Sequence, residues 1–316
     1  MLTTVDRVEN RFHMPCRPRL IGMSAPSPYA AALARIPSKD RSIDVLGSRT
    51  HLVEYGPSDA PRALVLVHGF RGDHHGLEPV IAHLPEFRIL SPDLPGFGLS
   101  APLEGRAHDI ASYAAWLDAL LQELGIRGEA VILGHSFGSI VASAAVASGT
   151  PTPSLVLVNP IGAPALSGPR GVLTRLAVAF YRAGAALPSR LGFAVLRSRA
   201  VTRIMSVTMA KTRDRALRRW IHAEHDRYFS GFATRDMLLE AFRASVSHDV
   251  SEFAADVASP TLLVAAVDDD ITPIARQREL VALFPDARLV EIPDVGHLIH
   301  YETPEAAASA IREFLA

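Results

Sequence analysis

A serine lies between two glycines in the segment Gly134-His135-Ser136-Phe137-Gly138. The residues before this segment form an apolar run typical of a buried strand, and those after it form an alanine-rich stretch typical of a helix. A serine at such a strand–turn–helix junction has an exposed hydroxyl at a helix N-terminus, where the helix dipole favours developing negative charge. The glycines are needed because strand and helix nearly collide there. The pattern predicts that Ser136 is a nucleophile held in a strained backbone conformation.

A nucleophilic serine needs a general base, and the base needs a group that orients it. His297 is the candidate base, because it follows the last expected strand and precedes the last expected helix. The candidate orienting group is one of three adjacent acids, Asp268, Asp269 and Asp270, which also lie between a strand and a helix. Asp269 is the first choice. Asp268 and Asp270 have the simpler interpretation of solvated loop charges.

The elements expected to position these residues alternate between strand and helix. Apolar runs closed by turn residues predict strands that are buried on both faces, and two shorter segments predict a hairpin; the eight ranges are 42–47, 49–56, 63–69, 87–93, 130–136, 154–160, 261–268 and 287–294. Apolar residues at helical spacing predict a helix over 110–124. Thr272 and Thr303 each precede a proline and are expected to cap helices. We therefore expect a mainly parallel eight-stranded sheet with helices on both faces.

About a hundred residues between two of these strands have helical patterns and no convincing strand. Residues 170–243 contain 15 Lys or Arg against 5 Asp or Glu, whereas the whole chain has a net charge of -1. We interpret residues 161–250 as an inserted helical cap between the two parts of the core, 42–160 and 251–316. Residues 1–41, with no sustained periodicity, are expected to be an N-terminal extension.

These motifs together resemble the α/β-hydrolase superfamily, in the branch that carries a helical cap. The resemblance covers about residues 42–316 and rests on the patterns at 68–70, 93–100, 134–138, 269–273 and 296–297. It implies an α/β-hydrolase fold and a triad in the chain order Ser136, Asp269, His297. It also implies an oxyanion hole formed by the backbone N–H groups of Phe70 and Phe137. One departure is Ala266, where the family commonly has glycine.

Other polar residues have structural interpretations. His68 is expected to support the loop after its strand, His135 to pack or line a pocket, and Asp93 to hold its turn together. The run Asp73-His74-His75 and the pair His297 and His300 could suggest a metal site, but no third ligand recurs at a fixed spacing. We therefore expect no metal and no bound cofactor.

Composition excludes some classes of protein. A near-neutral charge argues against a nucleic-acid binder, and the single cysteine, Cys16, fits a reducing compartment. No apolar run approaches the length of a membrane span, and the first twenty residues lack the apolar centre of a signal peptide. A cytoplasmic protein is expected. The arginines of the cap are either a solvated face or a site that attracts a carboxylate, a phosphate or a membrane surface.

These observations predict a serine hydrolase that cleaves a carboxylic ester or thioester with an apolar acyl group, through an acyl-enzyme at Ser136. The alternatives are hydrolysis of a carbon–carbon bond in a diketone-like acid and, less favoured, acyl transfer or cofactor-free haloperoxidation. A non-catalytic receptor for a small ligand on the same fold is the alternative from outside the enzymes.

Overall fold

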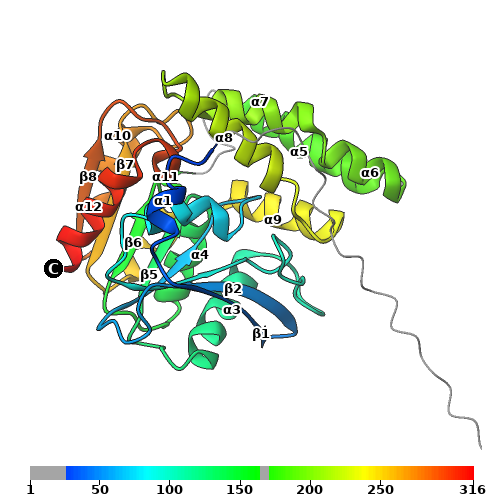
Figure 1. Ribbon diagram of the computed structural model, residues 1–316. Helices are drawn as coiled ribbons and strands as arrows, with labels where there is room; N and C mark the ends of the chain where they lie inside the picture. The colour runs from blue at the N-terminus through cyan, green and yellow to red at the C-terminus, as the bar shows by residue number, and fades with distance from the viewer. Residues whose placement is uncertain (1–25, 164–170) are drawn as a thin grey trace, which may run out of the picture.

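A computed structural model describes residues 26–163 and 171–316 of the chain (Figure 1). The expected N-terminal extension lies mostly outside these residues, as does Cys16. Within the described part, the first strand begins at Ser38, before the expected boundary at residue 42. Tyr29, near the start of the described residues, contacts the C-terminal part of the chain. Its hydroxyl donates to the carbonyl oxygen of Tyr301 at 2.7 Å.

A single eight-stranded sheet forms the centre of the fold, in the order β1-β2-β4-β3-β5-β6-β7-β8. The strands are β1 (Ser38–Val45), β2 (Ser48–Tyr55), β3 (Ala63–Val67), β4 (Arg88–Pro92), β5 (Val131–His135), β6 (Leu155–Val158), β7 (Thr261–Ala266) and β8 (Ala287–Ile292). β2 pairs antiparallel with both β1 and β4, and every pair from β4 to β8 is parallel. The expected mainly parallel eight-stranded sheet is confirmed.

Helices cover both faces of this sheet because successive strand residues point to opposite sides. On β3, Val65 and Val67 belong to one buried cluster, and Leu64 and Leu66 belong to another. The first cluster is completed by α3 (Ile110–Glu123), α4 (Phe137–Ala147) and α10 (Ile274–Val281). The second contains residues of η1 (His74–Leu77), α2 (Glu78–Ile81), α11 (Ile299–Glu302) and α12 (Pro304–Leu315), with α1 (Ala30–Leu33) at its edge. The central strands β3, β5, β6 and β7 are therefore buried on both sides, as their continuous apolar sequences predict, whereas the edge strands β1 and β8 are largely exposed or half-buried.

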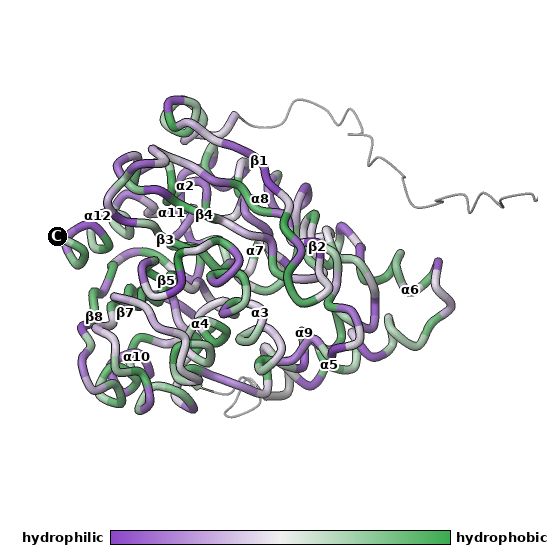
Figure 2. Tube along the Cα trace, turned by 90° about the horizontal axis from the view of Figure 1, so that it is seen from below, coloured by the Kyte–Doolittle hydropathy of each residue, from purple (hydrophilic) through white to green (hydrophobic). Residues whose placement is uncertain are grey.

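A helical insertion follows β6 and precedes two short helical turns, η2 (Val250–Glu252) and η3 (Ala254–Asp256), and then β7. It consists of α5 (Gly171–Ala186), α6 (Ser189–Leu196), α7 (Arg199–Met209), α8 (Arg215–Tyr228) and α9 (Arg235–Ser247). We call it the cap. Figure 1 shows the cap helices together on one side of the molecule, and α6 lies far from the C-terminus in both views (Figures 1 and 2). In the described part of the chain, no helix is long and apolar enough to cross a membrane.

The capping expectation holds only in part. Thr303 is the N-cap of α12 and Pro304 its first residue, but the threonine side chain makes no capping hydrogen bond. At α10 the expectation is wrong, because the N-cap is Pro273 and the helix begins at Ile274. The hydroxyl of Thr272 donates instead to Asp269, at 2.6 Å. The Thr272 side chain therefore contacts a carboxylate three residues earlier in the chain and does not cap α10.

Candidate active site

The backbone at Ser136 has the strained geometry that the sequence predicts. Ser136 joins β5 to α4 with φ 52° and ψ −118°, a region that residues other than glycine rarely occupy. A Cβ atom on Gly138 would lie 2.1 Å from the carbonyl oxygen of Val67, and one on Gly134 would lie 2.4 Å from that of Gly138. Only glycine fits at either position. The sharp turn leaves the serine side chain half-buried at the edge of a cavity.

Three residues from distant parts of the chain meet at this turn. The Nε2 atom of His297 lies 2.9 Å from the Oγ atom of Ser136, and its Nδ1 atom lies 2.7 Å from Oδ2 of Asp269. A carboxylate can only accept at Nδ1, so Nδ1 carries the proton and the lone pair of Nε2 faces the serine hydroxyl. The arrangement can accept a proton from Ser136 without moving any side chain.

Asp269 is held as an anion by four donors. Besides His297, its carboxylate accepts from the backbone N–H groups of Ile271 at 2.7 Å and Thr272 at 3.1 Å, and from the Thr272 hydroxyl. Burial by itself would raise the pKa of Asp269, but the interactions with His297, Thr272 and Ile271 hold it well below its usual range. The neighbouring Asp270 is exposed and pairs with Lys211 of the cap. Of the three adjacent acids, the structure brings Asp269 to the histidine.

Two positioning groups were missed from the sequence. One is the Thr272 hydroxyl described above. The other is Asn159, at φ 44° directly after β6. Its side-chain amide donates to the carbonyl oxygen of His297 at 2.9 Å, and its side-chain oxygen accepts from the N–H of Ala266 at 2.9 Å. Asn159 thus ties the histidine loop to the ends of β6 and β7. The sequence does contain a signal for this role, because Asn159 lies at the end of an expected strand and so at the same sheet edge as Ser136.

The two amides expected to form an oxyanion hole lie beside Ser136. Phe137 is the first residue of α4, so its N–H has no partner within the helix. Phe70 follows β3, and both phenylalanines line the same cavity as Ser136 and His297. Among the described residues, neither amide donates to a protein acceptor. Two backbone donors are therefore available beside the serine.

His68 and His135 occupy the places that the sequence predicts. The Leu94 N–H donates to Nε2 of His68 at 2.9 Å, so Nδ1 of His68 carries the proton and donates to the Gly69 carbonyl at 2.8 Å. Burial lowers the pKa of His68 and keeps it neutral. His135 is buried and lines the cavity, and burial together with the nearby His297 lowers its pKa to about 3. Neither ring lies between the serine and the carboxylate.

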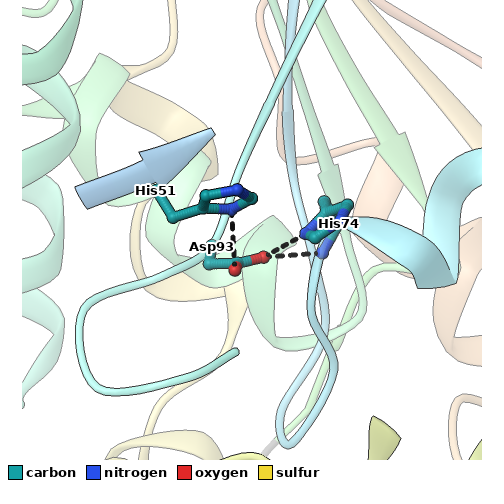
Figure 3. A group of neighbouring side chains, drawn as sticks. All are labelled: His51, His74 and Asp93. Atoms are coloured by element: carbon teal, nitrogen blue, oxygen red, sulfur yellow. Dashed lines mark hydrogen bonds and ion pairs between the residues drawn. The ribbon is translucent and has the colours of Figure 1, made fainter. Parts of the chain in front are cut away.

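Asp93 lies between the rings of His51 and His74, as Figure 3 shows. Its two oxygens accept from the ring of His51 at 3.2 Å, from the ring and the backbone N–H of His74, both at 2.8 Å, and from the Leu99 N–H at 2.8 Å. The hydrogen bond to Asp93 raises the pKa of His51. His51, His74 and Asp93 are close enough to hold a metal ion, but the carboxylate is already saturated by donors. The cluster therefore fastens the turn at 93–99 to the segment that follows the Phe70 loop.

A cavity of about 820 Å³ opens over the serine. Its volume lies in the range usual for small-molecule sites. Apart from the site itself, its wall is mainly apolar and comes from both the core and the cap; it includes Leu77, Ile161, Met205, Met209, Phe229, Phe242, Val246, Ile271 and Leu298. Such a wall suits an apolar group next to the reactive centre.

Comparisons with known proteins agree with this geometry. A family model described as alpha/beta hydrolase fold matches residues 62–304. The putative carbamate hydrolase RutD of Caulobacter sp. (strain K31) is 26% identical over 268 residues, which is 84% of this chain and 94% of that protein. Among solved structures, a thermophilic esterase from Thermogutta terrifontis has a TM-score of 0.68 at 24% identity and covers 88% of this chain and 98% of its own. The enol-lactonase from Burkholderia xenovorans LB400 has a TM-score of 0.72 at 20% identity, covering 87% and 99%.

Proposed function

Because the chain belongs to the alpha/beta hydrolase fold family, we propose that it is a serine hydrolase that cleaves a carboxylic ester or thioester. The single observation that carries the proposal is the unbroken line of contacts from Asp269 through His297 to Ser136, at 2.7 and 2.9 Å. The similar proteins from Caulobacter, Thermogutta and Burkholderia act, by their names, on carbamates, esters and enol-lactones. All three reactions are hydrolyses at an acyl carbon.

The proposed reaction uses each group in turn. Ser136 Oγ attacks the acyl carbon while Nε2 of His297 takes its proton, and the carbonyl electron pair moves onto oxygen. The backbone N–H groups of Phe70 and Phe137 bind that oxyanion. His297 then gives the proton to the departing alcohol or thiol, which leaves an acyl-serine. Water gives a proton to Nε2 of His297 as it attacks the acyl-serine. Collapse of the second oxyanion breaks the bond to Oγ and releases the acid, and His297 returns the proton to Oγ, which restores Ser136.

The cavity supports an apolar acyl group. Met205, Met209 and Phe229 close it from the cap, and Phe242 lies beside Phe70 with ring centroids 5.6 Å apart. Methionine side chains adapt to irregular shapes, so we expect tolerance for acyl groups of different branching. Among the described cap residues no charged side chain lines the cavity, although Asp73, Asp270 and Arg276 of the core do. The apolar side chains that the cap contributes favour an ester over the diketone-like acid of a carbon–carbon hydrolase.

Other expectations from the sequence stay predictions. These are the cytoplasmic location, the domain boundaries at residues 160 and 250, and contact of the basic cap with an anionic surface. The last is supported by apolar side chains exposed on the cap beside its arginines, namely Leu176, Leu191, Ile204 and Val207.

Turnover of p-nitrophenyl esters and acyl thioesters of increasing chain length tests the proposal. We expect measurable hydrolysis by the wild-type protein, a preference for chains of intermediate length, and a loss of at least about 10³-fold in kcat for Ser136→Ala. Ser143→Ala provides the matched control, because Ser143 lies two helical turns further on in α4 and its buried hydroxyl has no hydrogen-bond partner among the described residues. Equal activity of the wild type and Ser136→Ala would contradict the proposal.

A further inference from the structure

A buried arginine joins the loop of the candidate oxyanion hole to the cap. Arg71 directly follows Phe70, is 1% exposed, and has a left-handed backbone with φ 64°. Its side chain leaves the core and ends among cap residues. Nε donates to the carbonyl oxygen of Phe229 at 2.9 Å, and the two terminal nitrogens donate to the Tyr181 hydroxyl at 3.2 Å and the Leu196 carbonyl at 2.8 Å. One guanidinium therefore contacts α5, α6 and the end of α8.

No carboxylate in the part of the chain that the structure describes forms an ion pair with Arg71. Within the described residues, its hydrogen-bond acceptors are two backbone carbonyls and one hydroxyl. The sequence explains why, because residues 130–213, which include α5 to α7, contain no Asp or Glu. A buried guanidinium is costly unless all its acceptors are in place. The arginine consequently keeps its position only while the cap helices keep theirs.

The phenylalanine before it is coupled to the same helices. The ring of Phe70 packs edge-on against Tyr181, with centroids 5.8 Å apart, and Tyr181 stacks on Phe242 of α9 at 4.0 Å. Tyr181 thus contacts Phe70 through its ring and Arg71 through its hydroxyl. The peptide N–H of Phe70 lies between these two anchored side chains and the buried strand β3. A shift of the cap would move the loop that carries this N–H.

We infer that Arg71 is a positioning residue that makes the oxyanion hole depend on the closed cap. This inference rests on the proposed function and adds a condition to it, namely that the oxyanion hole is complete only when the cap is closed. When the cap closes over a bound substrate, its three acceptors fix Arg71, and Arg71 fixes the Phe70 amide. When the cap is displaced, the guanidinium loses its acceptors and the N–H of Phe70 is no longer held toward the substrate oxygen. The site is complete only around a substrate that lets the cap close.

The test compares Arg71→Met and Arg71→Lys with Arg197→Met. Arg197 is a suitable control because it also donates to a cap carbonyl, that of Phe232, at 2.8 Å and packs on two cap rings, but belongs to the cap itself. We expect Arg71→Met to lower kcat by about 10²-fold, as loss of one oxyanion donor does, with KM changed less than about 3-fold. The kcat of Arg71→Lys should lie between those of Arg71→Met and the wild type, since lysine keeps the positive charge but lacks the planar guanidinium. Arg197→Met should stay near the wild type.

Two further measurements separate positioning from simple structural support. A trifluoromethyl ketone places an oxyanion in the hole, whereas the matching secondary alcohol binds in the cavity without bonding to Ser136. Arg71→Met should weaken the ketone in parallel with kcat/KM and leave the alcohol unchanged. Hydrogen exchange of residues 68–75 should become faster in Arg71→Met and not in Arg197→Met. If Arg71→Met does not fold, Tyr181→Phe carries the test, with a several-fold lower kcat and an unchanged KM.

Several results would overturn the inference. Equal losses in Arg71→Met and Arg197→Met, or a change confined to KM and to binding of the alcohol, would reduce Arg71 to a packing role. Faster exchange of the loop at unchanged kcat would show that the hole does not depend on it. Failure of the proposed function has a different signature, because the wild-type protein would then neither hydrolyse esters nor bind the ketone more tightly than the alcohol.

Discussion

Replacement of Gly138 by alanine tests whether the contact between β3 and α4 sets the geometry of the site. The added Cβ atom would meet the Val67 carbonyl oxygen at 2.1 Å and that of His68 at 2.7 Å. Real Cβ contacts do not fall below 3.0 Å, so α4 and the end of β3 must separate by about 0.9 Å. Neither neighbour can yield cheaply, because both are backbone oxygens at the buried end of β3.

This displacement changes the distance between the two backbone donors of the proposed oxyanion hole. The N–H of Phe137 belongs to α4, and that of Phe70 follows β3 by three residues, so the change pulls the two proposed donors apart. A misplacement of about 1 Å costs about 10²-fold in rate, and overpacking of this kind costs about 1–3 kcal/mol of stability. We expect Gly138→Ala to fold with a lower Tm and to lose about 10²-fold in kcat/KM on p-nitrophenyl butyrate.

The matched control for this prediction is Gly231→Ala. There the nearest atom to an added Cβ lies at 3.4 Å and the backbone is not left-handed, so activity and Tm should stay close to those of the wild type. Gly138→Ala within two-fold of the wild-type kcat/KM would refute the reasoning. It would mean that the strand–helix contact does not determine where the two amides point.

Three further predictions follow from buried charges. Asp269→Asn should lower kcat by about 10³–10⁴-fold, because asparagine cannot hold the His297 tautomer, while the kcat of Asp270→Asn should stay near that of the wild type. Steady-state kinetics of the two variants tests this prediction, and equal losses in both would contradict it. Burial raises the pKa of Glu224 to about 7, so its ionisation opposes folding as pH rises from about 4.5 to above 7. Glu224→Gln should therefore add on the order of 1–2 kcal/mol at pH 8 and little at pH 5 in urea unfolding; an equal effect at both values would refute it. Asp93→Asn should cost about 3 kcal/mol at pH 7 in urea unfolding, since two buried imidazoles lose their shared anion. Burial by itself would raise the pKa of Asp93, but hydrogen bonds from His51 and His74 hold it in the folded protein well below its usual range. The difference should therefore shrink as the pH falls below about 4, where the unfolded wild-type chain takes up a proton on this carboxyl; a difference that persists there would contradict the assignment.

The sequence predicts the core of this fold well because its signals are local. Continuous apolar runs such as 63–69 and 261–268 indicate strands buried on both faces, and the structure has β3 and β7 within them. The strained turn at Ser136 follows from glycines two residues away on each side. These features depend on neighbours in sequence, so a sequence pattern is sufficient to find them.

The remaining features depend on partners that are distant in sequence. Thr272 has the pattern of an N-cap, but its hydroxyl bonds to Asp269, and only the folded loop determines which acceptor it finds. For Asn159 the sequence shows only that it lies at the end of an expected strand, and for Arg71 it gives no signal, because their partners lie 138 residues and 110 to 158 residues away. Long-range hydrogen bonds of this kind depend on how the cap and loops pack together.

The most direct test of the account is to treat the folded wild-type protein with a fluorophosphonate and to locate the adduct by peptide mass spectrometry. The account predicts one adduct, on Ser136, whose formation slows strongly in His297→Ala and stops in Ser136→Ala. A folded wild-type protein that takes no label, or that is labelled on another residue, would contradict it.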